Sequence, residues 1–166
     1  MPTTSFDNGL TANLTNAGMV AGTTSTYTTT AQTNCAIRGK FATPLAIQTN
    51  AATPTLDANT GVAFSALQAN QACALVLGVN QAGAIQMVQG PIIGTNPGIT
   101  TTPGALLNVP QFPALPTNFC PLAYTVVEAA PSSAGWIPGT GSWTAAGITA
   151  TAFQNVVELP DRPQAS

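Results

Sequence analysis

The chain has 166 residues, of which only 5% are charged, and its formal net charge is −2. With three Lys and Arg residues and no histidine, it has neither a basic groove for nucleic acid nor the imidazole that Ser-His-Asp catalysis, Cys-His catalysis or a histidine metal site requires. The three cysteines are too widely spaced for a CxxC site, and we interpret them as small buried hydrophobic residues. The sequence therefore predicts no metal or other cofactor.

The beginning of the chain lacks the positive start and apolar run of a signal peptide. The most apolar stretch, residues 72–79, is too short to cross a membrane. We therefore expect neither a secretory leader nor a membrane span.

Residues 1–34 are predicted to form a Thr-rich, extended N-terminal arm. Residues 23–30 are almost entirely Thr and Ser, and large apolar side chains are too few here to offset the cost of ordering the chain. Two outcomes are open: a flexible tail, or an arm that adds a strand to a partner through backbone hydrogen bonds.

From residue 35 to the end, we expect one β domain. Residues 36–41 and 45–49 are strand-like and flank a Thr-Pro turn, and residues 62–67 suit either a strand or a short helical turn. Residues 72–79 and 84–89 are two β-rich runs separated by Asn-Gln-Ala-Gly, a pattern that predicts a hairpin.

Residues 90–116 form a long connection with six prolines. This proline content excludes a helix or a central strand. Loops of this length in a compact domain are usually functional or docked on something.

The last third of the chain adds strands at residues 122–128 and 149–159, and Trp136 and Trp143 bracket a Pro-Gly turn between them. Six or seven short strands without an amphipathic helix predict an all-β sandwich or a jelly-roll-like barrel of short antiparallel strands.

Residues 58–127 contain no ionisable charge over 70 consecutive positions. Such a surface is easily covered by another protein, because no ion has to lose its water, and many copies can crowd together without repulsion. The alternative interpretation is an ordinary domain whose polar surface consists of amides and hydroxyls.

Few residues suit catalysis or ligand binding. Glu128 and Glu158 end predicted strands and would need to lie about 5 to 9 Å apart to act as a glycosidase pair. We interpret both side chains as solvated carboxylates at the edge of the sheet and expect that the protein is not an enzyme. Trp136 and Trp143 could stack on a sugar, but we favour a role in the core or in an interface.

Three groups of segments, 84–90, 112–116 with 120–124, and 153–163, resemble virion proteins of tailed bacteriophages, in particular small capsid decoration (cement) proteins. The likeness covers residues 35–163. It implies a β-rich, commonly homotrimeric protein at threefold or quasi-threefold positions of the shell, bound to the major capsid protein. It also implies synthesis in the host cytoplasm, a final location on the capsid surface, and no catalytic residues.

On this interpretation the protein holds capsid subunits together, and the 1–34 arm and the 90–116 loop make the bridging contacts. Deleting the arm is then expected to weaken attachment and leave the β domain folded. One alternative is a tail-fibre or spike component whose tryptophans bind glycan, and a further one is a carbohydrate-active enzyme that uses the two glutamates. The candidate interface residues are Tyr27, Ile92, Ile93, Leu106, Leu107, Phe112, Trp136 and Trp143.

Overall fold

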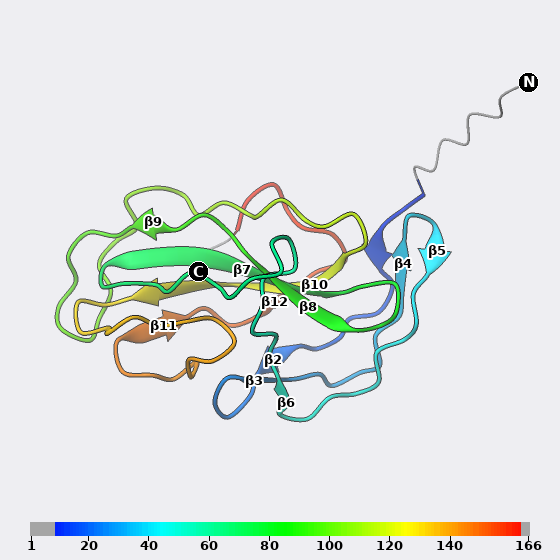
Figure 1. Ribbon diagram of the computed structural model, residues 1–166, viewed down its shortest axis with the longest axis horizontal. Helices are drawn as coiled ribbons and strands as arrows, with labels where there is room; N and C mark the ends of the chain where they lie inside the picture. Colours follow the sequence, from blue (N-terminus) through cyan, green and yellow to red (C-terminus); the bar gives the residue numbers. More distant parts are fainter. Residues whose placement is uncertain (1–8, 164–166) are drawn as a thin grey trace, which may run out of the picture.

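The computed structural model describes residues 9–163, which form β-strands, turns and loops without a helix (Figure 1). The prediction of an all-β, sandwich-like fold is confirmed. Since these residues form no helix, none of them forms one that could span a membrane.

The largest sheet has the strand order β11-β10-β7-β8, and two short strands, β9 and β12, pair with β7 and β10 at their ends. All of its pairings are antiparallel. The long central pair β7 and β10 is almost wholly buried, as expected for strands covered on both faces. The strand bounds are β7 Gln71–Val79, β8 Ile85–Gln89, β9 Ile93–Gly94, β10 Cys120–Ala129, β11 Ile148–Ala150 and β12 Gln154–Asn155.

Two small antiparallel sheets contain the N-terminal strands. One has the order β1-β4-β5 and the other β2-β3-β6. Both supply buried side chains to the core cluster that covers one face of the large sheet, which gives the sandwich its second layer. Their strand bounds are β1 Ala12–Asn13, β4 Cys35–Ile37, β5 Lys40–Phe41, β2 Val20–Ala21, β3 Thr26–Thr28 and β6 Ala51–Ala52.

The two faces of the large sheet follow from the alternation of side chains along each strand. Leu75 and Leu77 belong to the core cluster shared with the small sheets. Val76 lies between them in sequence and belongs to a second cluster with Tyr124. Within residues 9–163 no sheet covers this second face. Apolar side chains of the proline-rich loop and of the C-terminal segment pack there instead, namely Phe112, Leu115, Val156 and Leu159.

The hairpin predicted around residues 80–83 is confirmed, since β7 and β8 pair directly from Leu75–Gln89 to Val79–Ile85. The Asn80 side-chain oxygen accepts hydrogen bonds from the backbone N–H groups of Ala82 and Ala84, at 3.0 and 3.1 Å. Gly83 has a φ of 76°, a conformation that glycine adopts without a steric penalty. Local turn chemistry therefore sets this register.

The prediction of a separate N-terminal arm is wrong for residues 9–34. Met19 and Tyr27 are buried in the main core cluster, and the backbone N–H of Asn13 donates to the carbonyl of Val157 at 3.0 Å. The few large side chains of this Thr-rich region suffice because they pack on the large sheet rather than on one another. The remainder of the predicted arm, residues 1–8, lies outside the described residues.

This integration also overturns the expectation that deleting residues 1–34 would leave a folded domain. The deletion would remove β1, β2 and β3 and uncover one face of the large sheet. The fold therefore continues across the predicted boundary at residue 34.

Candidate interaction surface

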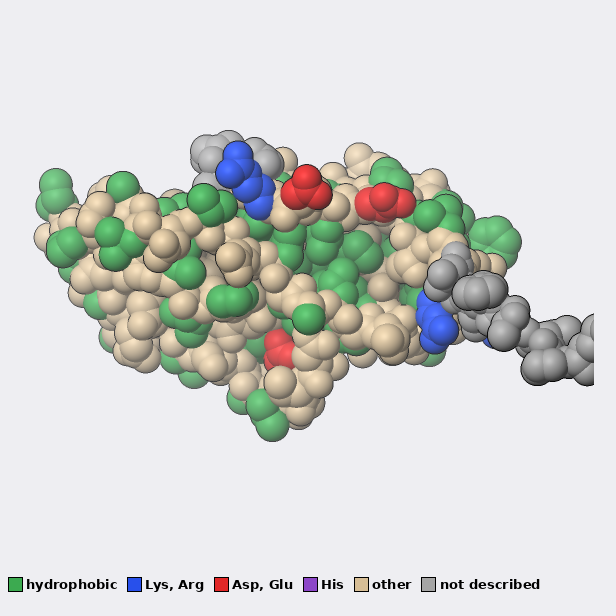
Figure 2. Space-filling model, turned by 90° about the horizontal axis from the view of Figure 1, so that it is seen from above, with side chains coloured by type: hydrophobic (Ala, Val, Ile, Leu, Met, Phe, Trp, Pro, Cys, Tyr) green, Lys and Arg blue, Asp and Glu red, His purple; other side chains and the backbone are tan. Residues whose placement is uncertain are grey.

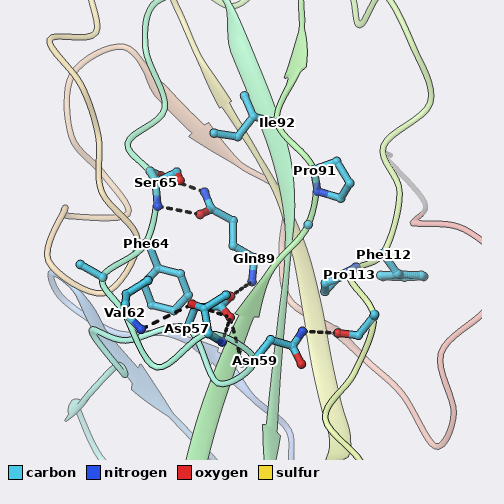
Figure 3. A pocket seen from close by; sticks show the side chains of 14 residues that line it. Asp57, Asn59, Val62, Phe64, Ser65, Gln89, Pro91, Ile92, Phe112 and Pro113 are labelled. Carbon is cyan, nitrogen blue, oxygen red and sulfur yellow. Dashed lines mark hydrogen bonds between the residues drawn. The ribbon is translucent and has the colours of Figure 1, made fainter.

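A groove with a cavity volume of about 580 Å³ runs beside the edge strand β8 (Figure 3). One wall is the segment 57–65, and the other is the proline-rich loop at residues 90–92 and 112–114. The uncharged stretch of the sequence thus supplies every lining residue except Asp57.

Asp57 shapes the first wall of the groove. One carboxylate oxygen accepts hydrogen bonds from the backbone N–H groups of Asn59 and Thr60, at 2.8 and 3.1 Å. The other oxygen accepts one from the backbone N–H of Gln89 at 2.9 Å. The side chain therefore closes a tight turn and ties that turn to β8.

Gln89 joins the same wall to the sheet. Its side-chain oxygen accepts a hydrogen bond from the backbone N–H of Ser65, and its side-chain nitrogen donates to the carbonyl of Ser65, both at 2.9 Å (Figure 3). The Gln89 amide thus provides a hydrogen-bond partner for both the backbone N–H and the carbonyl of Ser65, which does not lie in a strand. Asn59 in turn donates a side-chain hydrogen bond to the carbonyl of Ala114 on the opposite wall.

The polar groups along the groove therefore bond to one another, whereas the rim is apolar. Val62 is 61% exposed, and Ile92 and Phe112 are half-buried on the other side. The side chains of Asp57, Asn59 and Gln89 already have hydrogen-bond partners within the groove. With walls of Pro, Ile, Phe and Val, the groove suits an apolar side chain better than a charged ligand. Across residues 9–163, no group of three or more Cys, Asp or Glu side chains could hold a metal ion.

Three of the predicted interface residues lie in the core. Tyr27, Trp136 and Trp143 are each at most 5% exposed. The ring centroids of Trp136 and Trp143 are 5.4 Å apart, and their indole N–H groups donate to backbone carbonyls of Ser142 and Thr26 at 2.9 Å. These three residues are therefore removed from the candidate interface set, and the two tryptophans offer no exposed platform for a sugar.

The other five predicted interface residues lie on or beside the proline-rich loop. Ile92, Ile93, Leu106 and Phe112 are half-buried, and Leu107 is 59% exposed. Phe112 packs edge-on against Tyr124, with ring centroids 4.9 Å apart, so part of its side chain covers the second face of the sheet. The loop is thus anchored from inside while it presents apolar groups outside.

Sequence reasoning missed three exposed apolar residues of the uncharged stretch. Ile99 is 81% exposed, and Val62 and Val109 are 61% and 52% exposed. All three lie in the uncharged stretch, and isolated apolar residues flanked by Gly, Pro and Asn were the available signal. Figure 2 shows a face on which hydrophobic side chains line a central depression, with acidic side chains at its border.

The two glutamates considered as a catalytic pair lie far apart. Glu128 is near the end of β10, opposite Thr149 of β11. The chain leading to Glu158 runs beside the other end of β10, where the backbone N–H of Val156 donates to the carbonyl of Leu122. Six residues of strand separate these positions, or about 20 Å, which is beyond the reach of a glycosidase pair.

The fold and the surface together define an all-β sandwich with a sparsely charged, partly apolar exterior. Asp57 is the one carboxylate among the residues that line the groove. Comparison of the chain with protein-family models, curated protein sequences and solved structures gives no significant match.

Proposed function

We propose that this chain is a virion structural protein that binds the outside of a phage capsid and stabilises it by bridging neighbouring major capsid subunits. The observation that carries the proposal is the set of exposed apolar side chains in the stretch that lacks charges. Ile99, Leu107 and Val109 are all more than half exposed on the proline-rich loop, and Val62 lies across the groove from it.

The physical basis is the low cost of covering such a surface. Burial of apolar area contributes roughly 25 cal/mol per Å², and no ion between residues 58 and 127 has to be desolvated. A modest binding free energy per copy adds up to a large stabilisation when many copies bind to one shell. A protein that holds neighbouring subunits together in this way would be stabilised on the shell mainly by the burial of apolar surface.

In this proposal the partners are the major capsid protein and further copies of the same chain in a homotrimer. The protein is made in the host cytoplasm and ends on the capsid surface. The resemblance of residues 35–163 to decoration proteins supports this assignment, and the irregular, apolar proline-rich loop supplies contacts of the required kind.

Binding of the purified chain to capsids that lack it tests the proposal. We expect the double variant Ile99→Lys with Leu107→Lys to bind at least about tenfold more weakly, because each change places a charge in an apolar contact. Leu14→Lys is the matched control, since Leu14 is 47% exposed and follows β1, which pairs with β4 at the other end of the molecule from β9 (Figure 1).

Equal binding by the double variant and the control would remove the proline-rich loop from the interface. Absence of any binding by the wild-type chain would overturn the decoration role itself. Copy number adds an independent measurement: decoration requires many copies per particle, and a fibre component is present in few.

A further inference from the structure

Two of the three cysteines lie together in the core. Cys35 is on β4 of a small sheet, and Cys120 begins β10 of the large sheet. They are 2% and 0% exposed and belong to the same hydrophobic cluster. Strands from two different sheets thus bring together thiols that are separated by residues 36–119, which is 84 residues of chain.

Strands β4 and β10 are in contact, and the two thiols are close enough for each to shift the pKa of the other. The interaction with Cys120 lowers the pKa of Cys35, and the interaction with Cys35, together with burial, raises the pKa of Cys120. The Cys35 sulfur also lies 3.9 Å from the side-chain oxygen of Asn13. The Cys120 sulfur lies 3.8 Å from the backbone carbonyl oxygen of Pro121.

Cys73 has a different environment. It lies on β7 opposite Val127, whereas Cys120 pairs with Val79, six residues further along the same strand. That separation is about 20 Å, so Cys73 is out of reach of Cys120. Burial raises the pKa of the Cys73 thiol to about 12, which leaves it unreactive as a nucleophile.

We propose that Cys35 and Cys120 form an intramolecular disulfide when the protein meets a disulfide oxidant such as glutathione disulfide, and that this bond fastens the N-terminal sheet to the large sheet. The thiols are free in the structure described. The reduced pair is the form expected in a cytoplasm, where glutathione keeps thiols reduced, and the bond forms once the protein is in an oxidising medium.

The reaction proceeds by thiol–disulfide exchange. The Cys35 thiolate attacks one sulfur of glutathione disulfide, forms a mixed disulfide and releases one glutathione thiolate. Cys120 then loses its proton and attacks the Cys35 sulfur, which releases the second glutathione. The two cysteines together lose two electrons and two protons, and one glutathione disulfide is reduced to two thiols.

The test is to refold the full chain with and without glutathione disulfide, because refolding gives the oxidant access to both buried sulfurs. Remaining thiols are then alkylated under denaturing conditions and counted by intact mass. We expect three alkylated cysteines in the reduced protein and Cys73 alone in the oxidised one, with a Cys35–Cys120 linked peptide after digestion. Three alkylated cysteines in both samples, or linked peptides that contain Cys73, would overturn the proposal.

Two variants serve as controls. Cys73→Ala is expected to form the same bond, and Cys35→Ala is expected to form none. The oxidised wild type is expected to melt roughly 10 °C higher than its reduced form, since the bond closes a long loop. Dithiothreitol should abolish this difference and leave the melting of Cys35→Ala unchanged. An oxidised form that melts no higher would show that the bond does not fasten the two sheets.

Discussion

At the scale of single residues, an aromatic cluster connects distant parts of the chain. Trp143 lies between Trp136 and Phe153, with ring centroids 5.4 and 5.5 Å away, and its indole N–H donates to the carbonyl of Thr26. The ring thus joins the loop after β10 to strand β3 of a small sheet. Its role is structural, although its type and position also suited a binding residue.

We expect Trp143→Ala to lower the free energy of unfolding by about 3–5 kcal/mol, the usual cost of deleting a buried aromatic side chain. Trp143→Phe should cost less, because a ring remains and only the hydrogen bond and part of the volume are lost. Urea denaturation measures both. Phe41→Ala is the control, since Phe41 is 80% exposed, and an equal loss in this variant would contradict the assignment.

Glu128 makes the stability depend on pH. Burial raises the pKa of its carboxyl above the ordinary value of 4.5, so the folded state favours the protonated form. The contribution of Glu128 to the free energy of unfolding is therefore greatest below pH 4.5 and is lost as the pH rises through the raised pKa. We expect Glu128→Gln to lack this decline and to be more stable than the wild type at neutral pH.

Denaturation midpoints across acidic to neutral pH measure this difference between variant and wild type. Glu158→Gln provides the control, because Glu158 is exposed, and its profile should run parallel to that of the wild type. Parallel profiles for Glu128→Gln as well would show that the desolvation of Glu128 has no effect on folding.

At the scale of elements, the N-terminal strands form part of the sandwich. Met19 precedes β2 and is fully buried, and its backbone N–H donates to the side-chain oxygen of Asn155 on β12 at 2.7 Å. Asn155 returns a hydrogen bond to the carbonyl of Met19 at 3.0 Å. One amide side chain thus holds this segment against the last strand.

We expect Met19→Ala to lower the free energy of unfolding by about 2–5 kcal/mol in a single cooperative transition. Leu14→Ala is the matched control, as Leu14 lies in the same segment and is 47% exposed. Chemical denaturation followed by tryptophan fluorescence reports on the whole fold, because both tryptophans are in the core. A negligible effect of Met19→Ala would favour a detachable N-terminal segment.

The sequence predicted those elements whose signals are local. The hairpin at 80–83 has Asn and Gly at the turn and β-branched residues in its strands, and most residues of β10 are apolar. The N-terminal strands were misassigned because Met19 and Tyr27 find their partners in the large sheet, more than 40 residues away in sequence. The burial of the tryptophans could not be predicted from the sequence either, since the carbonyl that accepts the hydrogen bond of Trp143 lies 117 residues away.

The groove was only partly predictable. Proline content located the loop that forms one wall, and Ile92 and Phe112 were recognised on it. The opposite wall depends on hydrogen bonds that the side chains of Asp57 and Gln89 accept from backbone N–H groups. Such contacts produce no periodic pattern in a sequence. Val62 and Ile99 were missed because their one sequence signal, an isolated apolar residue next to a glycine, does not specify whether the side chain is exposed.

At the scale of the whole molecule, the surface combines exposed apolar side chains with very few charges. We expect capsid binding to change little when NaCl is raised, because few ion pairs are available to be screened. Sulfate should strengthen it, since sulfate favours the burial of apolar surface. Titrations in the two salts measure this. Binding that weakens steeply with NaCl would indicate an electrostatic interface instead.

The two ends of the described chain are joined by hydrogen bonds. The Asn13 side chain donates to the carbonyl of Val156, and the backbone N–H of Met19 donates to the side-chain oxygen of Asn155, across 143 and 136 residues. During synthesis, Asn13 and Met19 are added to the chain long before their partners Val156 and Asn155. Such remote pairings make folding slow, and strands that wait unpaired are prone to aggregate. The segment at residues 13–19 can therefore take its final place only after residues 155 and 156 have been synthesised, and it is among the last parts of the fold to order.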